Sequence, residues 1–415
     1  SKNLKAVVVR GNIEPVLYQP EEMKTFCSEM SKRIGDIYKA GAAMRVYGTS
    51  YVPPITNELG ILPTRNFQSG QFEGIEGLMP EVLRQKYLVR NKACYRCPIA
   101  CGRVTKVDEG KYKGEGEGPE YETIAAMGSD CGIDSMAAVT VANYICNELG
   151  LDTISTGMTI ACAMEMYEKG LIPEEEIGMP LRFGDADAMI ELVKKAAYRD
   201  GFGEKISQGS YRLAESYGHP EFSITAKRQE FPGYDPRGSK GMGLLYATSN
   251  KGASHMAGDM AYVEVFGTPE KIDSLTYEGK PELVMRFEDC FALIDSAGLC
   301  VFLSVRNMFG PNAKLWPTNL KTIMNMATGM EYSEEDLLKT GERIFNTERM
   351  FLIKAGFTKA DDTLPPRILH EPLPAGGAKG HVLDLDLMLP AFYKARGWDE
   401  NGVPTPERLQ ELGII

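Results

Sequence analysis

Long apolar runs, closely spaced disulfide cysteines and an excess of positive charge are all absent from this sequence of 415 residues. No apolar run reaches the roughly 18 residues that a membrane-spanning helix needs, so we expect no membrane association. A net charge of −11 disfavours nucleic acid, a polyanion, as a main partner. Nine cysteines scattered over so long a chain do not resemble a secreted disulfide framework, which favours a cytoplasmic protein.

An initiator methionine is also missing, and the chain opens with "SKNLKAVVVRG". Residues Leu4 to Val9 have the composition of a β-strand, and the segment is not a secretory signal. We therefore expect the chain to be a fragment from which an amino-terminal portion has been removed.

Most of the remaining sequence has helical periodicity, so we expect a mainly α, multihelical fold. Asp134 is predicted to cap a helix that ends at Gly150, and Asp152 a helix that ends at Gly170. Further helices are expected within 185–201, 205–218, 281–298 and 333–356, and a short hairpin within 102–115.

A segment rich in turn residues, Gly218–Gly233, is the best candidate for a domain boundary. It divides the chain into two expected helical domains, 1–222 and 223–415. A second such run, Pro365–Gly380, is predicted to form a long surface or lining loop.

The stretch "CYRCPIAC" places Cys94, Cys97 and Cys101 within eight residues. Thiolates select zinc, copper(I) or iron–sulfur clusters, and a zinc site built from cysteines usually shows two close pairs. This chain has one triplet and no second pair, which favours a 4Fe–4S cluster with one remote ligand, although a structural zinc stays the alternative. Cys300 at the end of "DSAGLC" is the best candidate for the fourth ligand.

Two related hexapeptides follow strong helical patterns: "NELGLD", from Asn147 to Asp152, and "DSAGLC", from Asp295 to Cys300. Each has a polar residue, two further residues and then Gly-Leu before a carboxylate or thiol. Helix ends of this kind can present side-chain oxygens and free backbone groups to a polar cofactor, although Gly-Leu alone is an ordinary helix C-cap.

Taken with "GPEYETIAAMGSDCGI", "DPRGSKGMGLLYATSNKGASH" and "ARGWDENG", these motifs resemble the tungsten-dependent aldehyde:ferredoxin oxidoreductases. The resemblance covers essentially the whole chain and implies the two carboxy-terminal helical domains of that family, without its amino-terminal β-rich domain. It also implies that the fragment is inactive alone, because that domain supplies one face of the cofactor site.

The resemblance implies a tungsten or molybdenum centre held by two pterins, beside a 4Fe–4S cluster. It assigns the cluster to Cys94, Cys97, Cys101 and Cys300, and the pterins to Asn147, Leu151, Asp152, Asp295 and Leu299. Asn147 stands where the family has an aspartate. A metal bridge between subunits is not expected, because "AVTVANYICNELG" lacks the histidine of the family's Glu-x-x-His pair.

The activity implied is oxidation of a small aldehyde to a carboxylic acid, with ferredoxin as electron acceptor. His255 in "NKGASH", one of four histidines, matches the family's active-site histidine and could donate a hydrogen bond to the aldehyde oxygen. Glu120 and Glu122 of "GPEYET" are the candidate bases; Glu120 is favoured and Glu122 stays open.

Two other functions stay open from the sequence. One is the tungsten subunit of a benzoyl-coenzyme A type reductase, which would work with partner subunits, and the other is a non-catalytic helical protein with a structural zinc. A homodimer is also compatible with the sequence.

Overall fold

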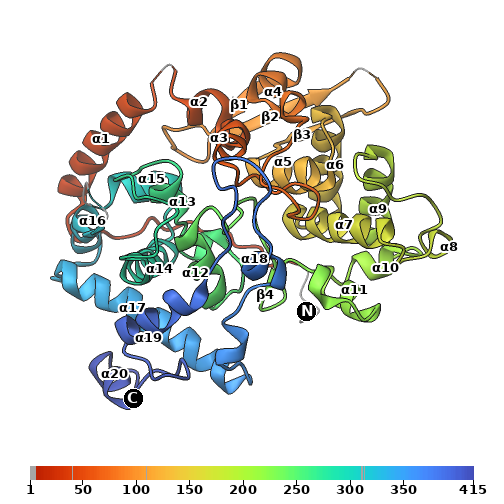
Figure 1. Ribbon diagram of the computed structural model, residues 1–415. Coiled ribbons are helices and arrows are strands. Elements are labelled where there is room, and N and C mark those ends of the chain that lie inside the picture. The colour runs from red at the N-terminus through yellow and green to blue at the C-terminus, as the bar shows by residue number, and fades with distance from the viewer. Residues whose placement is uncertain (1–5, 40, 109, 310–311, 313) are drawn as a thin grey trace.

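The computed structural model describes residues 6–39, 41–108, 110–309, 312 and 314–415. It is mostly helical, as the periodicity predicts (Figure 1). The helices before the hairpin at 225–230 are α1 Pro20–Ile37, α2 Ala43–Tyr47, α3 Val52–Leu59, α4 Pro80–Lys86, α5 Tyr121–Met127, α6 Met136–Leu149, α7 Thr153–Glu168, α8 Glu174–Ile177, α9 Ala186–Tyr198, α10 Gly203–Ile206 and α11 Ser210–Ser216. Those after it are α12 Lys240–Thr248, α13 Ala261–Glu264, α14 Lys280–Ser296, α15 Val301–Asn307, α16 Thr318–Thr328, α17 Glu334–Lys354, α18 Pro366–His370, α19 Leu389–Arg396 and α20 Pro406–Glu411.

Short 3₁₀ turns join many of these helices. They are η1 Gly48–Tyr51, η2 Ile75–Leu78, η3 Ser129–Cys131, η4 Pro220–Phe222, η5 His255–Ala257, η6 Lys359–Asp361 and η7 Leu385–Leu387. In the text below, the residues before and after the 225–230 hairpin are called the first half and the second half. None of the helices in the described ranges is long and apolar enough to cross a membrane.

Five short strands form two small antiparallel sheets. The strands β1 Leu88–Lys92, β2 Gly102–Val107 and β3 Gly114–Glu117 pair in the order β1-β2-β3, and β4 Thr225–Ala226 pairs with β5 Gln229–Glu230. The predicted hairpin is present: its first strand, β2, has the predicted bounds, whereas its second strand, predicted at 110–115, lies at β3. Strand β1 was not predicted. The predicted opening strand is wrong for Ala6–Val9, which form no strand, and its first residues, Leu4 and Lys5, lie outside the described residues.

Side-chain caps fix the start of the central helices of the first half. Ser135, and not the predicted Asp134, caps α6, because its hydroxyl accepts a hydrogen bond from the Ala138 N–H. The carboxylate of Asp152 caps α7 as predicted, accepting from the Ser155 N–H at 2.7 Å. The helix predicted within 205–218 is divided into α10 and α11 at Gly209, whose φ of 85° is left-handed.

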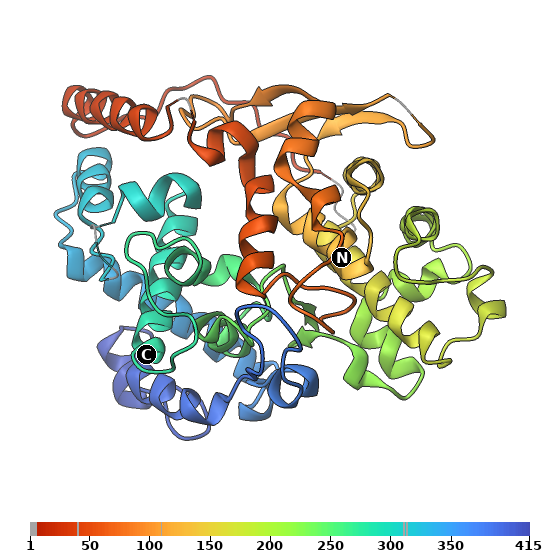
Figure 2. The ribbon, with the colours of Figure 1, turned by 45° about the horizontal axis from the view of Figure 1, so that its top comes forward.

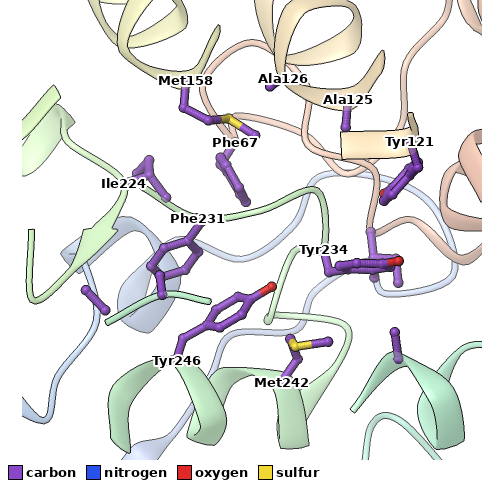
Figure 3. Close-up of a cluster of buried hydrophobic side chains, with 14 of the residues drawn as sticks. Phe67, Tyr121, Ala125, Ala126, Met158, Ile224, Phe231, Tyr234, Met242 and Tyr246 are labelled. Atoms are coloured by element: carbon purple, nitrogen blue, oxygen red, sulfur yellow. The ribbon is translucent and has the colours of Figure 1, made fainter. Parts of the chain in front are cut away.

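Buried aromatic rings join the two halves around one core (Figure 3). The Phe67 ring lies edge-on to Phe231 at 5.8 Å between centroids, and Phe231 contacts Tyr246 at 4.8 Å. Tyr121 at the start of α5 contacts Tyr234 at 5.1 Å. Because first-half and second-half rings interleave here, the relative position of the halves is fixed by packing as well as by the chain between them.

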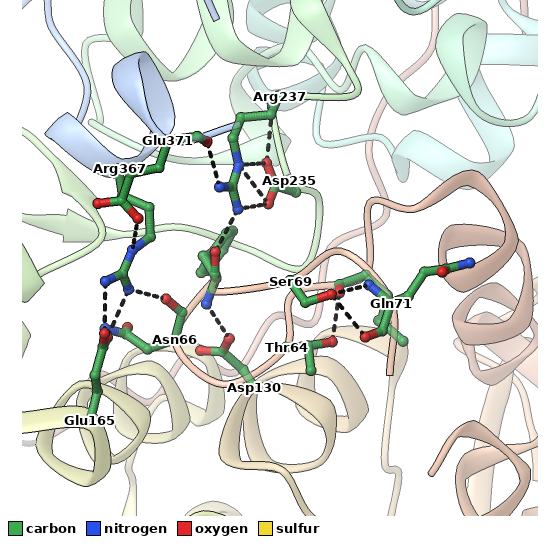
Figure 4. Close-up of polar contacts among 12 residues, drawn as sticks. Thr64, Asn66, Ser69, Gln71, Asp130, Glu165, Asp235, Arg237, Arg367 and Glu371 are labelled. Atoms are coloured by element: carbon green, nitrogen blue, oxygen red, sulfur yellow. Dashed lines mark hydrogen bonds and ion pairs between the residues drawn. The ribbon is translucent and has the colours of Figure 1, made fainter. Parts of the chain in front are cut away.

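Buried ion pairs reinforce the same junction (Figure 4). The Arg367 guanidinium of α18 binds both carboxylate oxygens of Glu165 in α7 at 2.7 Å and also donates to the Asn66 carbonyl. Arg237 binds the Asp235 carboxylate within the second half and donates across the junction to the carbonyl of Phe67 in the first half. Removing one partner of such a pair would leave a buried charge uncompensated, so these contacts strongly disfavour separation of the halves.

The first helix lies against the second half although it comes first in the chain. Helix α1 packs on α15 and α16, as Figure 2 shows at its upper left. The chain then turns back through α2 and α3 toward the core. The division into domains 1–222 and 223–415 stays a prediction, with α1 as the element that crosses it.

Candidate functional site

A cavity of about 440 Å³ is lined by residues of both halves. The first half contributes Cys101, Glu120 and Glu122, and the second half contributes His255 and Asp259. All three catalytic candidates of the sequence analysis therefore face one space. Aromatic and aliphatic side chains, among them Tyr51, Tyr234 and Phe302, form much of the remaining wall.

The Glu122 carboxyl and the His255 imidazole face each other across this cavity. Glu122 lies in the first turn of α5, and its Oε2 accepts a hydrogen bond from the Gly233 N–H at 2.6 Å. Its Oε1 lies 3.7 Å from His255 Nε2 and has no hydrogen-bond partner within the described part of the chain. Since 3.7 Å exceeds a hydrogen bond, both atoms keep their bonding capacity for a third group bound between or beside them.

Burial determines the protonation of this pair. It raises the pKa of Glu122 to about 8, with smaller increases from the charges of Asp259 and Asp152, against a decrease from the Gly233 hydrogen bond. Burial also lowers the pKa of His255 to about 4. At neutral pH the carboxyl therefore holds its proton and the imidazole is neutral, so the pair is not an ion pair.

Glu120 has a different environment, although it is only two residues away. It stands just before α5, is exposed, and accepts a short hydrogen bond from the Thr49 hydroxyl. The Thr49 hydroxyl also accepts a hydrogen bond from the Tyr121 N–H at 2.8 Å, so Glu120 helps to fix the start of α5. Its charge contributes to the pKa of Cys101 and of Arg103 and not to the pKa of His255.

Asp259 is a second buried carboxyl of the cavity, and it was not predicted. Burial raises its pKa to about 7, and its Oδ1 accepts a hydrogen bond from the Ala261 N–H at 3.2 Å. No motif marks this residue in the sequence. The one available signal was its spacing from His255. In the structure the Asp259 N–H donates to the His255 carbonyl at 2.7 Å, so the two residues lie on one turn of the chain.

The cysteine triplet lies on the loop between β1 and β2, beside the same cavity. Cys97 and Cys101 are partly buried, whereas Cys94 and Cys300 are exposed, and all four thiols are free. Burial raises the pKa of Cys101 to about 11, and the charges of Glu120, Cys300, Cys97 and Cys94 add to this increase. All three other predicted ligands therefore lie within electrostatic range of Cys101, including Cys300 from the second half.

Two arginines support the triplet loop through backbone carbonyls. Arg45 donates to the Pro98 carbonyl at 3.0 Å, and the buried Arg103 donates to the carbonyls of Ala100 and Met44. Gly48, with a φ of 61°, passes so close that a Cβ there would lie 2.5 Å from the Cys101 carbonyl oxygen. These supports were not predicted, because Arg45, Gly48 and the Met44 carbonyl come from a segment that is distant in sequence from the triplet.

Both Gly-Leu hexapeptides are helix C-caps with the same geometry. Gly150 ends α6 with a φ of 74°, and Gly298 follows α14 with a φ of 66°. The N–H of Leu151 donates to Cys146 and that of Leu299 to Ile294, which is the Schellman pattern in each case.

The polar residues of the hexapeptides lie at the surface and do not line the cavity. Asn147 donates to the Glu117 carbonyl at 3.3 Å, and Asp295 lies 3.4 Å from the Lys251 ammonium, both half exposed. The last residue of each hexapeptide nevertheless affects residues of the cavity. The charge of Asp152 raises the pKa of Glu122, and that of Cys300 raises the pKa of Tyr38 and Tyr262. The polar ends of the hexapeptides therefore lie outside the wall of the cavity.

The donor set suits a cluster better than a single ion. Within the described residues, no three His, Cys, Asp or Glu side chains are close enough to hold one metal ion. Cys94, Cys97, Cys101 and Cys300 are soft donors, and the charges of the other three act on Cys101. In donor chemistry this set suits an iron–sulfur cluster, whose ligands are thiolates.

Comparison with known proteins identifies relatives over the whole chain. Residues 25–414 match the family model described as aldehyde ferredoxin oxidoreductase, domains 2 and 3. Tungsten-containing aldehyde ferredoxin oxidoreductases of Pyrococcus furiosus and Thermococcus kodakarensis are 46% and 45% identical, over 100% of this chain and 67% of each relative. An aliphatic sulfonate oxidoreductase WOR-like subunit of Pyrococcus furiosus is 28% identical, over 100% of this chain and 64% of that protein.

A solved structure supports the fold. The active-site complex BamBC of benzoyl coenzyme A reductase superposes with a TM-score of 0.76 at 20% identity, over 100% of this chain and 68% of that chain. At this identity the likeness concerns architecture alone. The family match and the identities of 44–46% together lead to one assignment, which confirms the resemblance inferred from the motifs: this chain belongs to the aldehyde ferredoxin oxidoreductase family.

Proposed function

We propose that this chain carries the active site of a tungsten-dependent enzyme that oxidises aldehydes to carboxylic acids and passes the electrons to ferredoxin. The observation that carries the proposal is the cavity in which Glu122 faces His255 beside the four-cysteine group. A pair of proton-handling groups next to a group of soft metal ligands is the combination that this reaction requires.

The reaction adds one oxygen atom from water to the aldehyde carbon and releases two protons and two electrons. When bound, the tungsten–pterin group supplies the two-electron oxidation, and an iron–sulfur cluster transfers single electrons. The protein must orient the aldehyde, stabilise charge on its oxygen and accept a proton.

His255 is the proposed donor to the aldehyde oxygen. Its pKa of about 4 keeps the imidazole neutral, so one ring nitrogen carries a hydrogen that can be donated without transfer of a full charge. The ring is 17% exposed, which lets it reach the cavity while its contact with Tyr234 holds its position.

Glu122, and not Glu120, is the proposed acceptor of a proton. Its pKa of about 8 is close to the working range of a general base, and its free Oε1 points toward His255. The bond from the Gly233 N–H to Oε2 fixes the carboxyl orientation. Glu120 is exposed and bonded to Thr49, so its proposed role is to position the start of α5.

The proposed cofactor ligands follow the sequence prediction. Cys94, Cys97, Cys101 and Cys300 would hold the 4Fe–4S cluster, and the pterins would contact Asn147, Leu151, Asp152, Asp295 and Leu299. The shared C-cap geometry of the two hexapeptides supports the second assignment, because each presents the same backbone groups at a helix end. Lys251 next to Asp295 offers a cation at that end as well.

Metal analysis and two conservative substitutions test the proposal. The holoenzyme should contain tungsten and about four irons per chain, whereas a structural zinc protein would contain zinc without iron. Glu122→Gln and His255→Asn should lower aldehyde turnover by roughly 10²–10⁴-fold while the cluster absorbance stays unchanged. Full activity of both variants would refute the catalytic assignment, even where the metal content agrees.

A further inference from the structure

The loop that carries the cysteine triplet lies in the most basic part of an acidic protein. Residues 82–106 contain seven basic residues and no acidic one, although the net charge of the chain is −11. The seven are Arg84, Lys86, Arg90, Lys92, Arg96, Arg103 and Lys106. Such a reversal of charge needs a reason, because like charges gathered in one place repel each other.

Most of these cations have no carboxylate partner. Lys92 pairs with Glu117, Lys106 with Asp108, and Arg103 is buried among carbonyls. The other four are exposed, as is Arg45, and none of the five forms an ion pair within the described ranges of the chain. We call these five residues the basic rim: Arg45, Arg84, Lys86, Arg90 and Arg96.

Hydrogen bonds tie the basic rim to the triplet. Arg45 donates to the Pro98 carbonyl within the triplet loop, and its own carbonyl accepts from the Asn91 side chain of β1 at 2.8 Å. Arg84 donates to the Val46 carbonyl at 2.9 Å, next to Arg45 in the chain. Arg90 lies on β1, and Arg96 lies between Cys94 and Cys97. The rim therefore borders the triplet loop on the β1 and α4 side.

Exposed thiol and apolar side chains are close neighbours of these cations in the chain. Cys94 is exposed, Tyr95 is 88% exposed, and Val89 is 53% exposed. An aromatic and an aliphatic side chain within a polar, charged border is the usual composition of a protein–protein interface. Large side chains this exposed, beside a predicted redox centre, suit a surface that another protein covers.

We infer that the basic rim and the Cys94–Tyr95 surface form the docking site for an acidic electron-carrier protein. The inference rests on the proposed function and adds where its ferredoxin binds. Carboxylates of the carrier would face the five rim cations, and Tyr95 would contact the carrier next to its redox centre. The charge of the remaining surface repels an acidic partner, so the rim is the region to which electrostatic attraction directs it.

The test reverses two charges that support nothing else. Lys86 and Arg90 form no side-chain hydrogen bond within the described chain, unlike Arg45 and Arg84, and neither lies between cluster ligands, unlike Arg96. The double variant is Lys86→Glu with Arg90→Glu. The matched control is Lys354→Glu with Lys394→Glu, two exposed lysines on α17 and α19, at the opposite end of the molecule from α4 and β1 (Figure 1).

The measurement is the ratio of two aldehyde-dependent rates of the holoenzyme, one with ferredoxin and one with a small viologen dye. At low salt we expect the rim variant to lower the ferredoxin-to-dye ratio about tenfold or more relative to the control, because rim charges mainly change the association rate. The difference between the rim variant and the control should shrink as salt is raised toward about 0.5 M, where screening limits the reach of a surface charge to a few ångströms.

An unchanged ratio would overturn the inference, as would an equal fall of both rates, which would locate the damage in the active site. Direct binding of ferredoxin to immobilised holoenzyme separates this inference from the proposed function. If the wild-type protein binds ferredoxin and the rim variant does not, the docking site stands even where no aldehyde is oxidised. If both proteins bind equally, the docking site lies elsewhere.

Discussion

The two sides of this active site differ in their relation to water. The Glu122–His255 pair is enclosed, and burial alone accounts for most of the pKa changes of both groups. The Cys94 side is exposed, and the cations of the basic rim near it form no ion pair within the described residues. Proton transfer benefits from a dry environment in which pKa values can be adjusted, whereas electron transfer to a protein needs a surface that another protein can reach. The chain separates these requirements although Glu122 and Cys101 line one cavity.

The largest effect is expected on the open side. Cys300→Ser should remove the iron–sulfur absorbance and bring aldehyde turnover below detection, because the remote ligand completes the proposed cluster. Cys27→Ser is the matched control, since Cys27 is also exposed and lies in α1 outside the ligand set. A Cys300→Ser enzyme with four irons and full activity would exclude Cys300 as a ligand.

The enclosed side is tested by comparing the two glutamates. Glu122→Gln should lower turnover by roughly 10²–10⁴-fold, because it removes the proposed proton acceptor while keeping the side-chain shape. Glu120→Gln should have a much smaller effect, since an amide oxygen can still accept the Thr49 hydrogen bond. The reverse order of effects would restore Glu120, the residue favoured from sequence, as the base.

The pH dependence should follow Glu122. Its pKa is raised from 4.5 to about 8, so the base form is scarce at pH 7 and predominates at pH 9. The value of kcat/KM should therefore rise about tenfold over this interval, and Glu122→Gln should flatten the rise.

The same shift has a consequence for stability. The unfolded chain loses this proton at a lower pH than the folded chain, so the contribution of Glu122 to the free energy of unfolding falls as pH rises from 4.5 to about 8. Chemical denaturation of the wild type and of Glu122→Gln at several pH values measures it. A wild-type pH slope identical to that of Glu122→Gln would contradict the raised pKa.

The smallest expected effect concerns the support of the triplet loop. Gly150→Ala places a side chain in the left-handed helical region, at a cost of roughly 1–2 kcal/mol, whereas Gly48, with a φ of 61° and a ψ of −158°, adopts a conformation that is nearly restricted to glycine. Only at Gly48 does the new methyl group also meet the Cys101 carbonyl, whereas the space beside Gly150 is open. We expect Gly48→Ala to lose roughly 1–3 kcal/mol more, with lower iron retention. Equal stability and equal iron content in the two variants would show that the triplet loop accommodates the added methyl group without destabilising the protein.

The sequence predicts the long periodic helices well, and it predicts poorly how the two halves pack against each other. Helices α6, α7, α14 and α17 and the β2–β3 hairpin were predicted, because each has its own cap or alternation signal. The opening strand was wrong for Ala6–Val9, since β-branched composition alone does not supply a pairing partner. Strand β1 was missed because its exposed residues, such as Arg90 and Lys92, show no apolar alternation.

For the site, the motifs indicated which residues to consider but not how they face one another. The sequence does not distinguish Glu120 from Glu122. Both line the cavity, but the start of α5 at Tyr121 leaves Glu120 exposed and buries Glu122. Asp259 has only its spacing from His255 as a signal and Arg103 has none, because their roles depend on chain segments folded against them. The fourfold cysteine assignment and the pterin ligands remain predictions that metal analysis and substitution can decide.

The meeting of the two halves at one cavity has a mechanical consequence. Glu122 and His255 come from opposite halves, as do Cys101 and Cys300, so the proposed proton transfer and electron transfer both depend on the packing between the halves. A small displacement of one half relative to the other would increase the distance within both pairs, while the helices themselves stay folded. Moderate heating should therefore lower aldehyde turnover and the cluster absorbance in the same transition. Inactivation would then follow from loss of the contacts between the halves and not from unfolding of the helices.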